Sequence, residues 1–231
     1  MRIVKGISTL MLAITLFAAW TGVSLANSEE QKVQEAADVL AKIMQMPEKG
    51  IPPVLLRDAR AVAVIPGVIK AAFVVGGRHG TGVLSTRAED GRWSDPVFVS
   101  ITGGSVGWQV GASSTDLVLV FKKMDDVEKL LNGKFTLGAD AAVAAGPVGR
   151  KASAATDVRL RSGILSYSRS RGLFAGVSLD GAALLIDDDA NAAYYGKSNL
   201  SAADILAGKA GEKPAATQNL KQALENYSKM K

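Results

Sequence analysis

The 231-residue chain has no cysteine, a single histidine (His79), and only 6% aromatic residues. Without cysteine there is no disulfide, no thiolate nucleophile, no cysteine-ligated zinc and no iron–sulfur cluster. One imidazole excludes every site that needs two. Sparse aromatic side chains also leave little on which the bases of a nucleic acid could stack. These absences remove many classes of enzyme and metalloprotein.

The overall charge is mildly basic. Hydrophobic residues make up 48% and charged residues 21%, with a formal net charge of +5. This composition is that of a globular protein and excludes disorder throughout the chain. The first 26 residues carry two basic and no acidic residues, so the remainder has a net charge of +3. Such a charge permits attraction to an anionic lipid surface but is smaller than nucleic-acid binders usually carry.

The first 26 residues have the pattern of a secretory signal peptide. Arg2 and Lys5 precede an apolar stretch from Leu10 to Trp20, and Ser24-Leu25-Ala26 supplies the small residues of a cleavage site. This apolar stretch is shorter than the ~20 residues that span a bilayer. We expect cleavage after Ala26 and export to the periplasm of a Gram-negative bacterium. An uncleaved N-terminal anchor is the alternative.

The mature chain is predicted to belong to the α+β class, with a mainly antiparallel barrel or sandwich-like core and peripheral helices at both termini. Apolar runs rich in Val, Ile and Phe and bounded by glycine predict short strands. They cover residues 61–65, 71–75, 82–85, 97–101, 107–111, 116–121, 135–137, 141–145, 158–160, 164–168, 173–178 and 182–186. We expect one domain over residues 27–208, followed by a linker and an amphipathic helix over residues 209–231.

Capping residues and apolar periodicity predict the helices. Ser28 opens a helix to Met46, and a second covers Met124 to Leu131 with Gly133 as its stop. Shorter helices are expected at residues 190–195 and from the Ser201 cap to residue 206. Thr217 is predicted to cap the last helix, which carries Leu220, Ala223, Leu224 and Tyr227 on one side.

Seven segments of the chain, in the same order, resemble the SYLF family, also called the Ysc84-type domain. They are Ala61–Pro66, Val75–Val83, Gly91–Pro96, Gly104–Ala112, Ala145–Arg150, Ser166–Leu179 and Asn191–Gly196. The likeness spans about residues 35–208. It implies phospholipid binding, with phosphoinositide ligands in eukaryotic relatives, actin or SH3 partners in some, and no known catalysis. For an exported bacterial chain, it implies membrane phospholipid as the ligand.

Two glycine-rich runs carry candidate anion-binding cations. Gly76–Gly82 contains Arg78 and His79, but apolar strand-like residues follow where a dinucleotide-binding loop would open a helix. A hairpin turn is therefore the simpler interpretation, in which Arg78 and His79 could still meet a lipid phosphate. Gly146–Lys151 contains Arg150 and Lys151, which could hold a phosphate oxygen or lie in a solvated turn.

Two further segments carry polar side chains in suggestive patterns. Ser166–Gly172 alternates serines on one strand face with Tyr167, Arg169 and Arg171 on the other. A nucleophilic serine there would need a base, and we find none to assign, so anion binding or a polar strand end is preferred. Asp187-Asp188-Asp189 lacks the spacing of an EF-hand loop and predicts a helix cap, with weak cation binding as the alternative.

These observations predict a non-enzymatic phospholipid-binding protein of the bacterial envelope that contacts the membrane surface peripherally. Anionic headgroups would meet Arg78, His79, Arg150, Lys151, Arg169 and Arg171. No cofactor, metal or nucleic acid is expected. The alternatives are an envelope protein that docks a protein partner through a sheet edge or the C-terminal helix and, third, a hydrolase.

Overall fold

The computed structural model describes residues 27–43, 45, 50–133, 135–148, 162–170 and 173–229. Several sequence-based predictions therefore lie outside the described residues. They are the signal peptide over residues 1–26, the strand at 158–160, and the candidate cations Arg150, Lys151 and Arg171.

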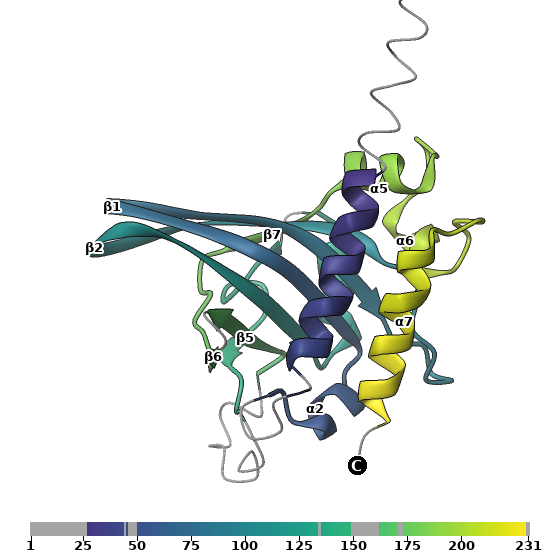
Figure 1. Ribbon diagram of the computed structural model, residues 1–231, viewed down its shortest axis with the longest axis horizontal. Helices are drawn as coiled ribbons and strands as arrows, with labels where there is room; N and C mark the ends of the chain where they lie inside the picture. The colour runs from purple at the N-terminus through teal and green to yellow at the C-terminus, as the bar shows by residue number, and fades with distance from the viewer. Residues whose placement is uncertain are drawn as a thin grey trace, which may run out of the picture.

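The centre of the fold is a curled, mostly antiparallel 7-stranded sheet with the order β3-β7-β2-β5-β4, in which β1 also pairs with β2 and β6 with β5 (Figure 1). Among the strands that the structure describes, only β4 and β5 pair in parallel. The strands are β1 (Ala61–Thr86), β2 (Val97–Phe121), β3 (Phe135–Thr136), β4 (Val143–Ala145), β5 (Ile164–Ser170), β6 (Leu173–Gly176) and β7 (Ala183–Ile186). The α+β class predicted from the sequence is confirmed.

The described helices lie before β1 and after β7, except for one between β2 and β3. An N-terminal helix covers residues 27–43. It is followed by α2 (Pro53–Arg57), α3 (Met124–Leu131), α5 (Asp188–Tyr195), α6 (Ala202–Leu206) and α7 (Ala215–Ser228). No helix within the described part of the chain has the length and hydrophobicity needed to cross a bilayer.

Local signals predicted most helix boundaries. The bounds of α3 are those expected, the Asp187 carboxylate accepts a hydrogen bond from the backbone N–H of Ala190, and the Ser201 hydroxyl accepts one from that of Asp204. The prediction for Thr217 was wrong. Helix α7 begins at Ala215 after Pro214, and Thr217 lies inside it, with its hydroxyl 2.7 Å from the Tyr194 hydroxyl.

Strand alternation divides the buried side chains between two faces of the sheet. Val118 and Val120 pack with the N-terminal helix and α7, on what we call the helix-covered face. Leu117 and Leu119 point to the opposite, inner face, where a second hydrophobic cluster includes residues of α3 and β3. Alternate residues from Leu117 to Val120 thus face opposite sides of the sheet, whereas the register shift between Ile65 and Val68 puts both of these residues on the inner face.

β1 and β2 form one long ribbon that folds back on itself. Their antiparallel register runs from Ala61↔Phe121 to Leu84↔Val97, with a shift between Ala72 and Val74. A Cβ built on Gly82 would lie 2.2 Å from the Val64 carbonyl oxygen, and one on Gly80 would lie 2.8 Å from Val68. The second half of β1 has therefore returned across its first half, and only glycine permits so close an approach.

This ribbon corrects two sequence-based predictions. The six separate strands expected between residues 61 and 121 are two continuous ones, and Gly76–Gly82 is strand rather than a hairpin turn. The actual connector between β1 and β2 is residues 87–96, where the predicted Asp90-Gly91 turn is found, with Gly91 at φ 84°.

Candidate ligand-binding site

A small cavity opens on the inner face of the sheet, where the two halves of the ribbon and β5 meet. Its volume is about 130 Å³, and it combines two cations, three hydroxyl side chains and four apolar side chains. The lining residues are Val68, Lys70, Arg78, Ser113, Thr115, Leu117, Ser168, Val177 and Leu179. We refer to this cavity as the Arg78 pocket.

The register of the sheet explains why these residues meet. Lys70 pairs with Ser113 across the ribbon, Val68 pairs with Thr115, and Leu117 pairs with Ser168. Alternate residues of a strand share a face, so residues 68 and 70 lie beside residues 113, 115 and 117. The returning half of β1 brings Arg78 to the same place.

The Arg78 guanidinium has unused hydrogen-bonding capacity. Its Nε is buried without a hydrogen-bond partner, and Nη1 lies a long 3.5 Å from the Ser178 carbonyl oxygen. Within the described residues, neither Arg78 nor Lys70 forms an ion pair with a carboxylate. A partly buried guanidinium with free donors favours an anion, because charge-assisted hydrogen bonds are stronger than neutral ones.

The size of the Arg78 pocket limits what can enter it. Pockets that enclose a drug-sized ligand usually measure about 300–1,000 Å³, and this one measures about 130 Å³. It can admit a phosphate group, but not a whole phospholipid. The apolar walls formed by Val68, Leu117, Val177 and Leu179 would then border the rest of an amphiphile.

The other predicted site residues that the structure describes lie elsewhere. His79 follows Arg78 in the strand and points to the other side, where Nδ1 lies 3.1 Å from the Thr102 hydroxyl. Arg169 pairs with Asp116 on the helix-covered face, with Nε and Nη2 donating to one carboxylate oxygen at 2.9 and 2.5 Å. The structure thus joins Arg78 with Lys70 and separates it from His79 and Arg169.

Three polar pocket residues lie outside every segment that the sequence analysis singled out as a candidate site, namely Lys70, Ser113 and Thr115. The sequence around each of them is typical of a strand or a polar loop and contains no binding motif. Only the pairing of residue 70 with residue 113 and the return of the ribbon bring them to Arg78. No local spacing pattern encodes those two facts.

A larger groove is a poor anion site. It measures about 820 Å³ and lies between the end of α3, β7 and the start of α6. Among the described residues that line it, the charged ones are Glu128 and Asp188. The carboxylates would repel an anionic headgroup, so the Arg78 pocket is the better candidate despite its smaller volume.

Ser166 and Asp187, which belong to the two polar segments considered from the sequence, have structural partners. The Ser166 hydroxyl lies against the carbonyls of Ala144 and Val177. Asp187 caps α5, as predicted. Within the described ranges there is no group of three or more histidine, aspartate or glutamate side chains placed to hold a metal ion.

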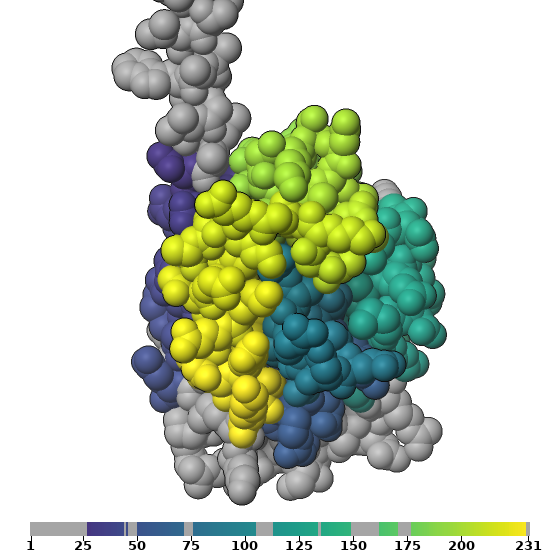
Figure 2. Space-filling view, turned by 90° about the vertical axis from the view of Figure 1, so that its right-hand side faces the viewer, coloured from purple at the N-terminus to yellow at the C-terminus, as the bar shows by residue number. Residues whose placement is uncertain are grey.

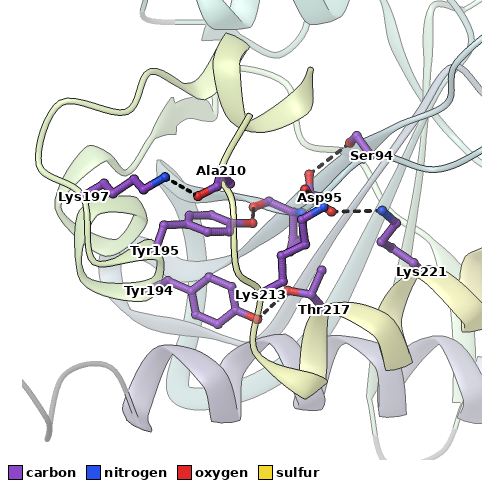
Figure 3. Close-up of polar contacts among 10 residues, drawn as sticks. Ser94, Asp95, Tyr194, Tyr195, Lys197, Ala210, Lys213, Thr217 and Lys221 are labelled. Carbon is purple, nitrogen blue, oxygen red and sulfur yellow. Dashed lines mark hydrogen bonds and ion pairs between the residues drawn. The ribbon is translucent and has the colours of Figure 1, made fainter. Parts of the chain in front are cut away.

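A second polar cluster ties the C-terminal part of the chain to the connector. Asp95 has a completely buried side chain whose oxygens lie 2.6 Å from Lys213 Nζ and 2.9 Å from Lys221 Nζ (Figure 3). The Tyr195 hydroxyl donates to the Pro96 carbonyl at 2.7 Å. Figure 2 shows α7, in yellow, beside this connector, in blue. Because the lysines already neutralise Asp95, this cluster fastens α7 rather than offering a free binding group.

Comparison with known proteins gives a consistent set of relatives. The family model described as "Ysc84: Las17-binding protein actin regulator" matches residues 102–227. The chain is 36% identical over 199 residues to LAS seventeen-binding protein 3 of Saccharomyces cerevisiae, covering 83% of this chain and 43% of that protein. It is 33% identical over 210 residues to the human SH3 domain-containing YSC84-like protein 1, covering 88% of this chain and 60% of that protein. The chain thus spans less than two thirds of the length of these curated relatives.

Proposed function

Because this chain belongs to the Ysc84 family, we propose that it is a non-catalytic protein that binds the anionic headgroups of membrane phospholipids. The observation that carries the proposal is the Arg78 pocket. It places a guanidinium with unused donors beside Lys70 and the hydroxyls of Ser113, Thr115 and Ser168. These are the groups that a phosphate would need, and an apolar wall for the lipid lies next to them.

The cellular setting is part of the same proposal. The N-terminal pattern of charge, apolar core and small residues supports export, and a bacterial envelope would supply anionic phospholipid at the destination. In this setting the protein acts as a peripheral membrane-binding module. Its reaction with the lipid is association only, without bond cleavage.

Docking of a protein partner through the C-terminal helix fits the structure less well. The names of the relatives refer to protein binding, but the apolar side of α7 is already used. Leu220 and Leu224 are buried in the core, and Lys221 is paired with Asp95. A partner that took this apolar side would have to detach the helix first.

The test is vesicle binding by the Arg78→Gln variant. Loss of a charge-assisted phosphate contact, worth about 1.5–3 kcal/mol, should weaken binding to phosphatidylcholine vesicles containing phosphatidylglycerol by about tenfold or more. Co-sedimentation across a series of lipid concentrations measures the effect. Binding should also fall with added salt, because exposed charges are screened.

Arg92→Gln is the matched control. Arg92 lies in the connector, is highly exposed, and pairs with Asp90. The substitution makes the same change of charge away from the pocket, so it should leave binding unchanged. Equal losses in the two variants would show that only the overall charge matters. Equal binding to vesicles without phosphatidylglycerol would contradict an anionic headgroup as the ligand.

A further inference from the structure

The far end of the β1–β2 ribbon extends away from the rest of the molecule. We call residues 69–77 of β1 and 103–114 of β2 the ribbon tip. In Figure 1 the bends of both strands reach furthest to the left, on the side away from α5, α6 and α7. From Val68 to Val74 the strand covers about 20 Å at ~3.3 Å per residue. The tip is therefore free to contact a surface before the helices do.

The composition of the ribbon tip is unusual for a segment that extends away from the rest of the molecule. It contains no aspartate or glutamate, and its only charged residue is Lys70, with Arg78 directly after it. The large apolar residues of the tip are Ile69, Phe73, Val74, Val75, Val106, Trp108 and Val110. Ile69 has an exposed fraction of 59%, against 41% for Val54 and 37% for Val148, the other exposed large hydrophobic residues among those whose side chains the structure describes.

We infer that the ribbon tip enters the interfacial layer of a phospholipid bilayer and that Lys70 and Arg78 lie at the level of the lipid phosphates. This inference rests on the proposed function and adds to it the part of the molecule that contacts the membrane and its orientation. An apolar end followed by cations matches the order of layers in an anionic bilayer, from acyl chain to phosphate. Tryptophan is also the residue most typical of that interface.

The charge of the tip favours a membrane over a protein partner. A protein surface that bound these apolar residues would also need carboxylates placed for Lys70 and Arg78. A bilayer with anionic lipid supplies negative charge all around the inserted segment. Lys70 lines the Arg78 pocket as well, so one orientation serves both the headgroup contact and the insertion of the tip.

The hydrogen bonding of the ribbon limits the depth of insertion. Between residues 103 and 115 the pairing partner of β2 is β1 alone, so each strand of the tip has one edge without a strand partner within the described sheet. Unpaired backbone groups are not tolerated in the hydrocarbon layer. The tip therefore stops in the interface, about 5–10 Å deep, as interfacial segments do.

The first experiment measures the depth of Trp108 with the full chain. The chain has three tryptophans, Trp20, Trp93 and Trp108, so the spectrum of Trp108→Phe is subtracted from that of the wild type. With vesicles containing phosphatidylglycerol and brominated phosphatidylcholine, the difference spectrum should shift to shorter wavelength and be quenched. No shift and no quenching while the protein co-sediments with the vesicles would overturn the inference.

The second experiment places a carboxylate at the tip. Ile69→Asp should weaken vesicle binding by about tenfold or more, because it removes an exposed apolar side chain at the level of Lys70 and adds a charge there that the lipid phosphates repel. Val54→Asp is the matched control, since Val54 is an exposed hydrophobic residue of α2. It should change binding less than twofold. Far-ultraviolet circular dichroism checks that both variants are folded, and equal losses of binding in the two would overturn the inference.

The outcomes separate this inference from the proposed function. If Arg78→Gln weakens binding but Ile69→Asp and the Trp108 signal do not respond, headgroup binding stands and insertion of the tip is wrong. If Trp108 is quenched equally in vesicles without phosphatidylglycerol and Arg78→Gln has no effect, insertion stands and the headgroup site is wrong. A spectral shift that depends on protein concentration without vesicles would indicate a second copy as the occupant and overturn the inference.

Discussion

The helix-covered face of the sheet and the ribbon tip differ in how their polar and apolar groups are satisfied. On the helix-covered face, Asp95 is neutralised by two lysines, and the hydroxyls of Tyr194 and Tyr195 have partners at 2.7 Å. At the tip there is no carboxylate, and Ile69 is 59% exposed. In the first region this carboxylate and these two hydroxyls are paired within the protein, whereas the tip presents an exposed apolar side chain and a lysine without an ion pair in the described part of the chain.

The difference predicts that the helix-covered face stabilises the fold and that the tip and the Arg78 pocket bind the ligand. Substitutions on the helix-covered face should change the free energy of unfolding, because they remove contacts made within the protein. Substitutions at the tip and in the Arg78 pocket should change vesicle binding with little effect on that free energy. The three predictions below test this separation in order of decreasing expected effect.

The largest effect is expected where the ribbon crosses itself. In Gly82→Ala the new Cβ would lie 2.2 Å from the Val64 carbonyl oxygen, which is backbone and has little freedom to move. We expect a loss of at least about 3 kcal/mol in the free energy of unfolding, measured by urea denaturation. Gly104→Ala is the control, because no atom lies within 4 Å of its added Cβ. Equal stability of the two variants would contradict the close crossing.

The next effect concerns the buried ion cluster. Asp95→Asn removes the charge that faces Lys213 and Lys221, whose side chains are 24% and 22% exposed. Breaking a buried pair costs about 3–5 kcal/mol, and the partial exposure of the lysines places the expected loss near ~3 kcal/mol. The urea midpoint and the thermal midpoint both measure it.

Arg78→Gln provides the comparison for Asp95→Asn. It also removes one charge, but Arg78 has no ion pair within the described part of the chain, so we expect a change below about 0.5 kcal/mol. A loss of stability in Arg78→Gln as large as that in Asp95→Asn would show that the pocket is a structural contact. The division between the two regions would then fail.

The smallest effect at neutral pH comes from the tyrosines. Burial raises the pKa of Tyr194 to about 12 and raises the pKa values of Tyr167 and Tyr195 well above the usual range. Between about pH 10 and 12 the unfolded chain has lost these protons and the folded chain has kept them, so stability falls as pH rises, by up to about 1.4 kcal/mol per pH unit for each tyrosine.

Urea denaturation at several alkaline pH values measures this slope, and absorbance at about 295 nm follows the tyrosinate. Tyr167→Phe should reduce the slope and cost little near neutral pH, because the Tyr167 hydroxyl is buried without a hydrogen-bond partner. Tyr195→Phe should cost about 1 kcal/mol near neutral pH, since it loses the bond to Pro96. A stability independent of alkaline pH would contradict the burial of these rings.

The parts of the fold that depend on neighbouring residues could be predicted from the sequence. Helix α3 and the caps at Asp187 and Ser201 each depend on residues within a few positions. The alternation along β5 is also confirmed, since Tyr167 lies in the helix-covered core and Ser168 lines the pocket on the other face. These signals depend only on neighbouring residues, and the local structure that they predict is present in the folded chain.

The parts of the fold that depend on distant residues could not be predicted from the sequence. Gly80 and Gly82 have the composition of a turn, yet they are glycine because Val64 and Val68 pass close by. Arg78 was predicted as a site residue from its own segment. Lys70 and Ser113 were not, because only the pairing and the return of the ribbon bring them beside Arg78. Arg169 looked equally available until its pairing with Asp116 placed it on the other face.

The position of Asp95 along the chain also has a consequence for the order of folding. This carboxylate lies in the connector after β1, and the second of its two lysines is synthesised 126 residues later. Until Lys213 and Lys221 have been synthesised, the Asp95 carboxylate has neither of these partners, and its burial is costly. Completion of the domain thus requires that α7 has been synthesised, and chains truncated before α7 remain open to proteolysis.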